Sequence, residues 1–468
     1  MKHKLLASIV SVLALCVQTS FGSPGGATPT AQDYVPGWHN WQPGYGEPTA
    51  QEGPHDPPTF KDDGAILVPD TSIAKDSLAG EGTHTNHSIL FLAQATTGSP
   101  SGLTPADIRS VYNLPSTGGS GVIAIVDAYH YPTALNDFNV FAKEFGLPTE
   151  TSTSATSSSN TVFQVVYATG RQPSTDGGWS QESALDVQWA HAMAPNAKIV
   201  LVEAASSSLS DLFTAIQVAS KISGVKEISL SWGTSEFRSQ TSYDSYFQTK
   251  STSSSSSTSS RNQFGPSMFG RASTSSAASS STSSTSTIVY FAASGDTGGK
   301  VIYPGSSPYV VSAGGTTLNF DASGNFLSET GWSGSGGGKS AFEAIPSYQS
   351  ALKSKLGSYR GVPDWSFNAD PYSGVSVYDS TAYNGVSGWM VFGGTSVSSP
   401  ALAGIANTAA TSRGSFSSTT AVQLALIYNN LGSSNFRDIV SGTAGSYSCA
   451  SGWDFVTGVG STLGLTGK

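Results

Sequence analysis

The stretch GVIAIVDAY, residues 121–129, places mostly apolar and largely β-branched side chains in succession. A strand with this pattern must be covered on both faces, as in a parallel sheet that lies between layers of helices. Similar strands alternate with helical patterns along the chain, with strands expected at 161–168, 198–204, 227–233 and 288–294 and helices at 134–145, 181–193 and 209–222. This alternation predicts an α/β fold with a mainly parallel central sheet and right-handed crossovers.

The stretch MVFGGTSVSSPALAGIA, residues 390–406, points to a reactive serine. A glycine pair precedes Thr395 and Ser396, a proline follows four residues after Ser396, and small apolar residues come next. This pattern is typical of a serine nucleophile at the mouth of a buried helix. Such a serine usually needs a neighbouring histidine that takes its proton.

The histidines of the chain do not fit that role. His84 and His87 lie in the polar stretch EGTHTNHS ahead of the first core strand, whereas subtilisin-like proteases have their aspartate strand first and their histidine helix later. His130 follows a strand end, in a loop. His191 lies on the helix expected at 181–193 and is expected to be a partly buried structural residue.

That helix instead carries a pair of carboxylates. At about 100° per residue, Glu182 and Asp186 are about 40° apart, whereas His191 lies about 180° from Glu182. Leu185 and Trp189 share the carboxylate face, which argues against full exposure. Glu182 is therefore the expected base, and Asp186 would hold it and share a proton with it. A carboxylate with a pKa of about 4 is partly ionised in acid, where an ordinary imidazole is protonated.

Asp296 is a further candidate. It follows the apolar strand IVYFAAS within the sequence SGDTGG, so the strand delivers it to its carboxyl end, where the sites of α/β proteins gather. The alternative for Asp296 is a turn residue before glycine.

The composition and the N-terminal sequence limit the classes of protein to which this chain can belong. Only 11% of residues are charged and the formal net charge is −9, which argues against a nucleic-acid surface. Residues 1–22 have a basic start and a short apolar run, as in a secretory signal peptide, and no other segment reaches the roughly 20 apolar residues of a membrane span. Cys16 would leave with the signal peptide, so Cys449 remains without an intrachain disulfide partner. We expect a secreted monomer that has no membrane or nucleic-acid partner.

The remaining chain divides into three kinds of segment. Residues 23–97 are rich in Pro, Gly and aromatic residues and read as an N-terminal extension or short pro-segment. Residues 98–468 form the expected catalytic domain. Within it, residues 249–287 are mostly Ser and Thr and form a low-complexity insertion with too little apolar area to offset ordering.

Taken together, these motifs resemble the sedolisin family of serine-carboxyl peptidases over about residues 100–468. The resemblance is carried by Glu182-x-x-x-Asp186 and then by SLSWG, SGD, YPGSSPYVVSAGGTTL, SGGG, RGVPDWSFNADP and GGTS-x-x-x-P. It implies a subtilisin-like three-layer domain with a mainly parallel sheet flanked by helices. It also implies an acid-acting endopeptidase that hydrolyses polypeptide substrates.

The resemblance assigns roles residue by residue. Ser396 matches the nucleophile, Glu182 the base and Asp186 its supporting acid, while Asp296 matches a protonated aspartate that donates to the oxyanion. Asp127 is given a supporting role, with a plain strand-end residue as the alternative. The segments SLSWG and SGGG match those that pair with an extended peptide, through Ser231, Trp232, Gly233, Gly336 and Gly337.

The tail FRDIV…SCASGWDFVTGVG resembles the calcium site of the family. Carboxylates of Asp438 and Asp454 and backbone carbonyls of Ile439, Ala450 and Gly452 would hold one Ca²⁺ ion. The family usually has glycine where Ala450 stands, and many members carry a pro-domain longer than residues 23–97. Two unrelated turn aspartates are the alternative for the metal site.

Two other functions compete with the acid peptidase. One is a histidine-dependent subtilisin-like protease, which the positions of the histidines disfavour. The other is a secreted, non-catalytic adhesion or scaffold protein, which would be marked by loss of Ser396, Glu182 or Asp296, and all three are present.

Overall fold

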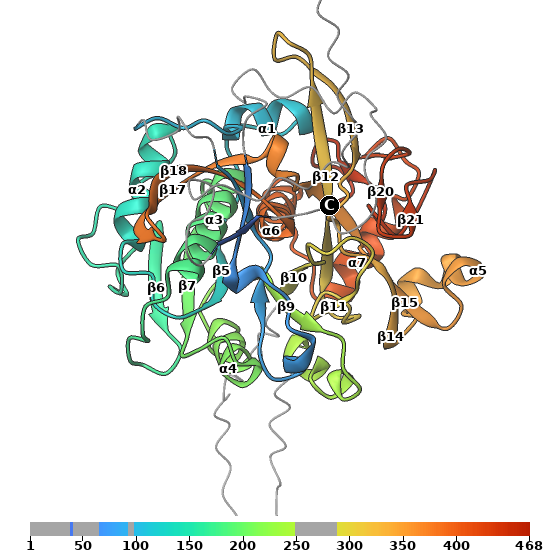
Figure 1. Cartoon of the computed structure of the whole chain (residues 1–468), viewed down its shortest axis with the longest axis horizontal. Helices are drawn as coiled ribbons and strands as arrows, with labels where there is room; N and C mark the ends of the chain where they lie inside the picture. The colour runs from blue at the N-terminus through green and yellow to red at the C-terminus, as the bar shows by residue number, and fades with distance from the viewer. Residues whose placement is uncertain (1–37, 41–64, 92–97, 249–287) are drawn as a thin grey trace, which may run out of the picture.

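The computed structural model describes residues 38–40, 65–91, 98–248 and 288–468 (Figure 1). The expected signal peptide at 1–22 and the insertion at 249–287 lie outside these ranges. Within them, no helix combines the length and the apolar character that a membrane crossing requires.

A ten-stranded sheet forms the centre of the molecule. Its order is β19-β22-β16-β12-β10-β8-β5-β7-β6, and β13 pairs with β12 outside this path. All neighbours from β22 to β6 run parallel, whereas β13 and β19 pair antiparallel. The mainly parallel sheet predicted from the sequence is therefore confirmed. The strands are β5 Val122–Ala128, β6 Phe163–Tyr167, β7 Lys198–Ala204, β8 Val225–Leu230, β10 Val289–Ala293, β12 Val311–Phe320, β13 Phe326–Gly331, β16 Trp365–Asn368, β19 Phe436–Arg437 and β22 Ser461–Thr462.

Alternate residues of β5 face two separate hydrophobic cores. Ile123 and Ile125 belong to the larger core, which packs under α1 Pro105–Tyr112, α2 Ala134–Glu144, α3 Gly177–Met193, α6 Thr395–Arg413 and α7 Thr420–Asn429. Ala124 and Val126 face the smaller core, which is covered by α4 Leu209–Ala219. Helices on both faces of the sheet give the three layers expected, because each face of a buried strand must be covered.

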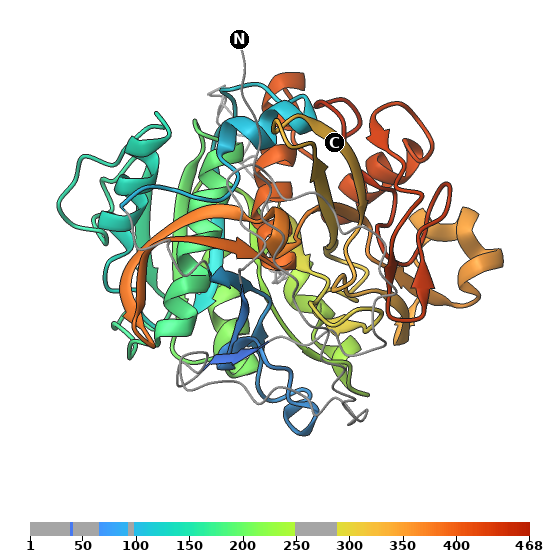
Figure 2. The same cartoon turned by 45° about the horizontal axis from the view of Figure 1, so that its top comes forward.

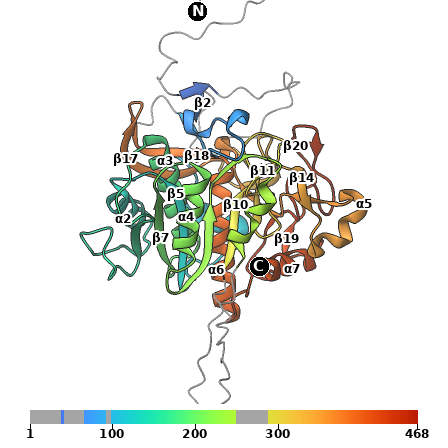
Figure 3. The ribbon, with the colours of Figure 1, turned by 90° about the horizontal axis from the view of Figure 1, so that it is seen from below.

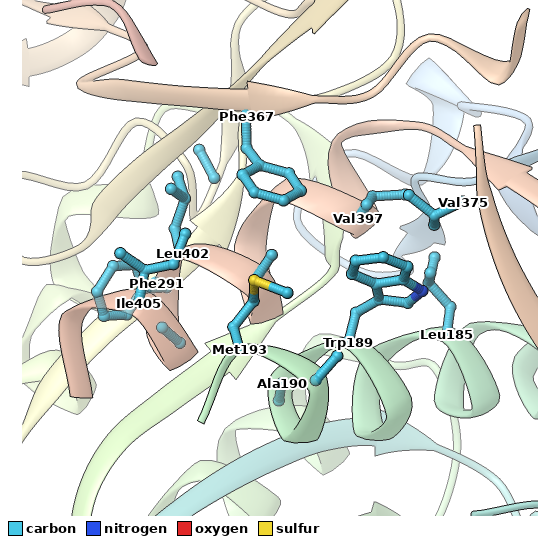
Figure 4. Close-up of a cluster of buried hydrophobic side chains, with 14 of the residues drawn as sticks. Leu185, Trp189, Ala190, Met193, Phe291, Phe367, Val375, Val397, Leu402 and Ile405 are labelled. Atoms are coloured by element: carbon cyan, nitrogen blue, oxygen red, sulfur yellow. The ribbon is translucent and has the colours of Figure 1, made fainter. Parts of the chain in front are cut away.

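The helices α3 and α6 pack against each other on one face of the sheet (Figures 1 and 4). In Figure 4, Trp189 and Met193 of α3 point toward residues of α6, including Val397 and Ile405. A β-carbon at Gly404 would lie 2.9 Å from the carbonyl oxygen of Ala190 and 2.7 Å from the β-carbon of Met193. Glycine at 404 therefore permits a close approach of the two helix backbones.

The strand expected at 227–233 divides in two at Ser231. β8 stays in the central sheet, whereas β9, Trp232–Ser235, leaves it and pairs antiparallel with β11, Ile302–Tyr303, and with β3, His84–Thr85. The chain therefore bends at the carboxyl end of β8, and Ser231 lies at the bend.

A second sheet brings the N-terminal residues onto the domain. Its order is β1-β2-β4-β18-β17, with β1 Trp38–Asn40, β2 Ala65–Pro69, β4 Ser88–Phe91, β17 Val375–Tyr383 and β18 Val386–Gly393. Figure 2 shows the long hairpin of β17 and β18 crossing α3, and Figure 3 shows β2 beside this hairpin at the rim of the domain. Residues 65–91, expected as part of an extension, are thus packed on the α/β domain. The remaining elements of the described residues are β14 Gly338–Ala344, α5 Lys353–Leu356, β15 Tyr359–Val362, β20 Thr443–Ala444, β21 Tyr447–Ser448 and six short 3-10 helices.

Candidate active site

Ser396 lies in the first turn of α6 and is fully buried. Its Oγ donates to the carbonyl oxygen of Ser231 at 3.1 Å. Proline at 400 has no N–H group, so the carbonyl of Ser396 lacks its usual helical partner four residues on. The hydroxyl of Ser231 lies 3.4 Å from that carbonyl oxygen. The proline in the serine motif therefore ties the start of α6 to the bend between β8 and β9.

Ser231 also connects Ser396 to the carboxylates of α3. Its Oγ donates to Oδ1 of Asp186 at 2.9 Å. Glu182 and Asp186 are fully buried, and Oε1 of Glu182 and Oδ2 of Asp186 accept no hydrogen bond from a donor group. Burial, followed by the charges of Asp127 and Glu182, raises the pKa of Asp186 well above its ordinary value. One proton shared by Glu182 and Asp186 would satisfy both free oxygens.

Asp127 joins the same group of buried carboxyls from the end of β5. It accepts a hydrogen bond from the hydroxyl of Ser183 at 3.0 Å, and its other oxygen has no donor. Burial and then the charge of Glu182 raise the pKa of Asp127 well above its ordinary value. Its place beside Glu182 fits a supporting carboxyl, because it is a buried acid that takes up a proton.

Asp296 follows β10 and is held by the first turn of α6. Its Oδ1 accepts hydrogen bonds from the backbone N–H and the hydroxyl of Thr395, both at 2.8 Å. Its Oδ2 is buried and has no partner. Burial is the main cause that raises the pKa of Asp296 to about 8, and the charge of Glu182 adds to it. Near neutrality and below, Asp296 is therefore a carboxylic acid that can donate a hydrogen bond.

The two glycine-containing segments expected to bind a peptide differ in what they contact. Trp232 and Gly233 pair with β3, and the indole of Trp232 donates to the carbonyl of Val126 at 2.8 Å. The N–H groups of Gly336 and Gly337 instead donate to the carbonyls of Gly295 and Lys300, at 2.7 Å and 2.8 Å.

Residues 82–88 of the N-terminal segment run through the site. The N–H of Thr83 donates to the carbonyl of Ser207 at 3.0 Å, and His84 and Thr85 pair antiparallel with Gly233 and Trp232. The N–H of Ser396 donates to the carbonyl oxygen of Asn86 at 3.0 Å. Sequence reasoning missed this occupancy, because the stretch EGTHTNHS has no periodicity that would place it.

His87 lies directly against the expected base. Its Nδ1 is 2.6 Å from Oε2 of Glu182, and its ring stacks on Phe392 with a centroid distance of 5.4 Å. The sequence position of His87, ahead of the first core strand, did not indicate this contact. Pairing of β4 with β18 carries His87 into the site, since β18 leads into Gly394 and α6.

His191 lies on the opposite side of α3, as the helix angles predict. Its Nε2 contacts the carbonyl oxygen of Pro148 at 2.8 Å, and its ring packs on Phe138. Burial lowers the pKa of His191 to about 4, so it is a neutral structural histidine over most of the pH range.

The tail residues suggested for calcium converge on one loop. Oxygens of Asp438 accept from the N–H of Gly452 at 3.1 Å, and Oδ2 of Asp454 accepts from the N–H of Ala450 at 3.0 Å. Ile439 follows Asp438 and is buried. No group of three or more His, Cys, Asp or Glu side chains suited to a metal occurs among the described residues, so a cation here would depend on backbone carbonyls as well. Oxygen donors of this kind fit a hard cation such as Ca²⁺.

Three comparisons with known proteins bear on this site. The chain is 33% identical over 178 residues to sedolisin of Pseudomonas sp. (strain 101), across 35% of this chain and 29% of sedolisin. It is 28% identical over 401 residues to kumamolisin of Bacillus sp. (strain MN-32), across 80% of this chain and 64% of kumamolisin. It is 31% identical over 187 residues to xanthomonalisin of Xanthomonas sp. (strain T-22), across 35% of this chain and 21% of xanthomonalisin. In each case the match spans less than two thirds of the relative.

The fold has a solved counterpart. The structure of Pseudomonas sedolisin, a serine-carboxyl proteinase complexed with two molecules of pseudo-iodotyrostatin, matches with a TM-score of 0.58 at 24% identity, over 78% of this chain and 96% of that one. This match supports the subtilisin-like fold. No family model matches the sequence.

Gly394 should be essential for seating residues 84–88. Its φ is +105°, and an added β-carbon would lie 2.2 Å from the carbonyl oxygen of Asn86 and 2.5 Å from Oδ2 of Asp296. We predict that Gly394→Ala lowers the melting temperature and speeds amide exchange of residues 84–88, measured by mass spectrometry.

Gly357→Ala is the matched control. Gly357 also has a positive φ, of +71°, but an added β-carbon would meet nothing within 4 Å. This variant therefore introduces backbone strain of about 1–3 kcal/mol and no steric clash. Equal exchange at 84–88 in the two variants would contradict the packing described here.

Proposed function

Because this chain belongs to the sedolisin family, we propose that it is a secreted, acid-acting serine endopeptidase that hydrolyses polypeptides. The observation that carries the proposal is the link through Ser231. Its backbone carbonyl accepts from Ser396, and its hydroxyl donates to Asp186, the neighbour of Glu182 on α3. A buried serine hydroxyl is thereby joined to a pair of carboxyls.

The proposed chemistry follows from these contacts. Ser396 Oγ attacks the carbonyl carbon of the substrate and passes its proton to Glu182. Asp186 holds Glu182 and takes part in sharing the proton. Negative charge then develops on the substrate oxygen, where the N–H of Ser396 and the protonated Oδ2 of Asp296 donate to it.

Secretion and a monomeric state complete the proposal. Residues 1–22 have the pattern of a signal peptide, and they lie outside the described residues. The low fraction of charged residues and the protonated buried carboxyls both suit an acidic medium.

Digestion of an acid-unfolded protein substrate at about pH 4 tests the proposal. We predict that Ser396→Ala and Glu182→Gln each lower turnover by about 10²–10⁴-fold, because they remove the nucleophile and the base. His191→Ala is the matched control from the same helix and should retain turnover in folded protein.

Two results would contradict this assignment. Equal losses in Glu182→Gln and His191→Ala would mean that disruption of α3, rather than loss of a base, explains the effect. Full turnover in Glu182→Gln, together with activity that rises through neutral pH and stays high, would favour a histidine-dependent protease.

Asp296 should set the alkaline limit of activity. Its carboxyl donates only while protonated, so raising the pH through its pKa, about 8 with the cleft covered, removes the oxyanion donor. Since burial is the main cause of that raised pKa, exposing the cleft to solvent should move the limit toward acid.

We predict that Asp296→Ala lowers kcat by about 10²–10³-fold. Asp296→Asn should retain more activity than Asp296→Ala and lose its alkaline limit, since an amide donates at every pH. The measurement is a pH profile of kcat for the three proteins. Identical profiles for the wild type and Asp296→Asn would exclude ionisation of Asp296 as the cause of the limit.

We further propose that one Ca²⁺ ion binds the tail through Asp438, Asp454 and the carbonyls of Ile439, Ala450 and Gly452. The two carboxylates converge on residues 450–452, and a cation would remove their mutual repulsion. The tail sequence SGTAGSYSCASG is rich in Gly and Ser, so ordering it has a large entropic cost that ion binding can offset.

Calcium should therefore raise the melting temperature. Mass action gives about 2.7 kcal/mol at a free concentration one hundred times the dissociation constant. We predict that chelator lowers the melting temperature of the wild type at about pH 5 and that excess Ca²⁺ restores it. Asp454→Asn should lose this response, whereas Asp321→Asn, which alters a carboxylate in an exposed turn, should keep it. A wild-type melting temperature that does not change with calcium would contradict the proposed calcium site.

A further inference from the structure

The β17–β18 hairpin departs from regular strand pairing where it lies beside α2 (Figure 1). The register of the two strands shifts between Asp379 and Tyr383. The backbone N–H groups of Ser380 and Thr381 fall within this irregularity, and donors that a ladder leaves unpaired need other acceptors. Two buried carboxyl groups, one from the hairpin and one from α2, supply these acceptors.

Asp137 of α2 is the carboxyl group that faces only donors along the chain that surrounds it. Its Oδ2 accepts from the hydroxyls of Tyr131 and Thr133, at 2.8 Å and 2.5 Å, and from the N–H of Ser380 at 2.9 Å. Its Oδ1 accepts from the amide of Asn136 at 2.9 Å and from the hydroxyl of Ser380 at 2.7 Å. Both oxygens are therefore acceptors, and Asp137 is the anion of the pair.

Asp379 of β17 is also fully buried, but its surroundings differ. Its Oδ1 accepts from the N–H of Thr381 at 2.7 Å, and its Oδ2 has no donor. The side chain lies within hydrogen-bond reach of Asp137. Burial, and then the charge of Asp137, raises the pKa of Asp379 well above its ordinary value. A proton on Asp379 that is donated to Asp137 satisfies both groups.

The neighbouring elements provide no cation to this pair. Asp379 lies opposite Gly388 on β18, and Gln188 of α3, which bonds to the backbone of β17, is neutral. From the side of α2, the ionisable groups are Asp137 and Tyr131. Neither carboxyl forms an ion pair with Lys, Arg or His in the part of the chain that the structure describes. The proton is thus what keeps two like charges from meeting in a buried place.

We propose that the proton shared by Asp379 and Asp137 is a latch that holds the β17–β18 hairpin on α2 in acid and releases it as the pH rises. The latch lies apart from the buried carboxyls near Ser396. It nevertheless bears on them, because β18 ends at Gly393 and leads directly into α6. Without the proton, two carboxylates would repel each other at the point where the hairpin is tied to α2.

The direction of the pH effect follows from the two states of Asp379. In the unfolded chain its pKa is about 4, whereas the folded protein keeps the proton to higher pH. Between these two pKa values the folded state binds one more proton than the unfolded state, so stability falls as the pH rises. The contribution of the latch is complete below about pH 4 and is lost once the pH passes the pKa of folded Asp379.

Asp379→Asn tests the latch because asparagine imitates the protonated acid. Its amide oxygen can accept from Thr381 and its NH₂ group can donate to Asp137 at every pH. We expect this variant to match the wild type in urea unfolding at about pH 4 and to become the more stable protein at higher pH. The ratio of the two unfolding equilibrium constants should grow about tenfold per pH unit until folded Asp379 ionises.

Hydrogen exchange, measured by mass spectrometry, locates the effect. At about pH 7, residues 375–393 of the wild type should exchange faster than those of Asp379→Asn, while β5 should exchange equally in the two proteins. Parallel stability curves of the two proteins from about pH 4 to about pH 8 would overturn the latch. An exchange difference that is absent from residues 375–393 would overturn it as well.

Asp321→Asn is the matched control. It makes the same chemical change at a carboxylate in an exposed turn, whose pKa is lowered by hydrogen bonds from Asn325. A lowered pKa has the opposite linkage, so this variant should gain no stability relative to the wild type as the pH rises. A gain as large as that of Asp379→Asn would show that removal of any carboxylate suffices and would overturn the latch.

Asp137→Asn tests which carboxyl bears the charge. Either orientation of its amide would turn an NH₂ group toward donors, so we expect this variant to be less stable than the wild type even at about pH 4. Asp379→Asn should show no such loss at that pH. An Asp137→Asn protein as stable as the wild type in acid would overturn the assignment of the charge to Asp137 and, with it, the latch.

Discussion

The packing of α3 against α6 is the contact on which the site depends. The two helices come from distant parts of the chain, and Gly404 lets their backbones approach closely at Ala190 and Met193. Glu182 on α3 and Ser396 on α6 are thereby fixed by a hydrophobic interface rather than by loops. Ser231, at the bend between β8 and β9, then bonds to both helices. A site held in this way has little freedom to lose when substrate binds, which favours catalysis.

Burial of acids is the second property of the site, and it follows from the first. Asp127, Asp186 and Asp296 each have a pKa raised chiefly by burial, and no lysine or arginine forms an ion pair with them among the described residues. Carboxyls in such surroundings retain protons well above their ordinary range, so the site contains hydrogen-bond donors where ionised aspartates would have none. The acid-acting chemistry that we propose would follow from the burial of these carboxyl groups.

The N-terminal segment changes what the cleft can do. Residues 65–91 cover it, and a cavity of about 550 Å³ remains between this segment and Asp296, Lys300 and Ile302. The cavity shows that the segment fills the groove along the backbone of residues 84–87 without filling the space beside it.

The helices and strands could be predicted from the sequence because the side-chain patterns that indicate them are local. The strand at β5 and the opposed faces of α3 follow from side-chain periodicity, and both are confirmed, including the position of His191 away from Glu182. The bend at Ser231 could not be predicted from the sequence, since SLSWG has the composition of one continuous strand. The place of His87 was not accessible either, because the pairing of β4 with β18 joins residues far apart in the chain.

The sequence by itself therefore determined the α/β class, the helix that carries Glu182 and Asp186, and the serine that begins α6. Only the tertiary structure decided that these groups meet through Ser231 and that Asn86 and His87 lie between them. The physical reason is range. Hydrophobic periodicity acts over a few turns of helix or a few residues of strand, whereas the occupancy of the cleft depends on backbone hydrogen bonds from residues 82–88 to β9, β18 and α6, whose partners no local pattern specifies.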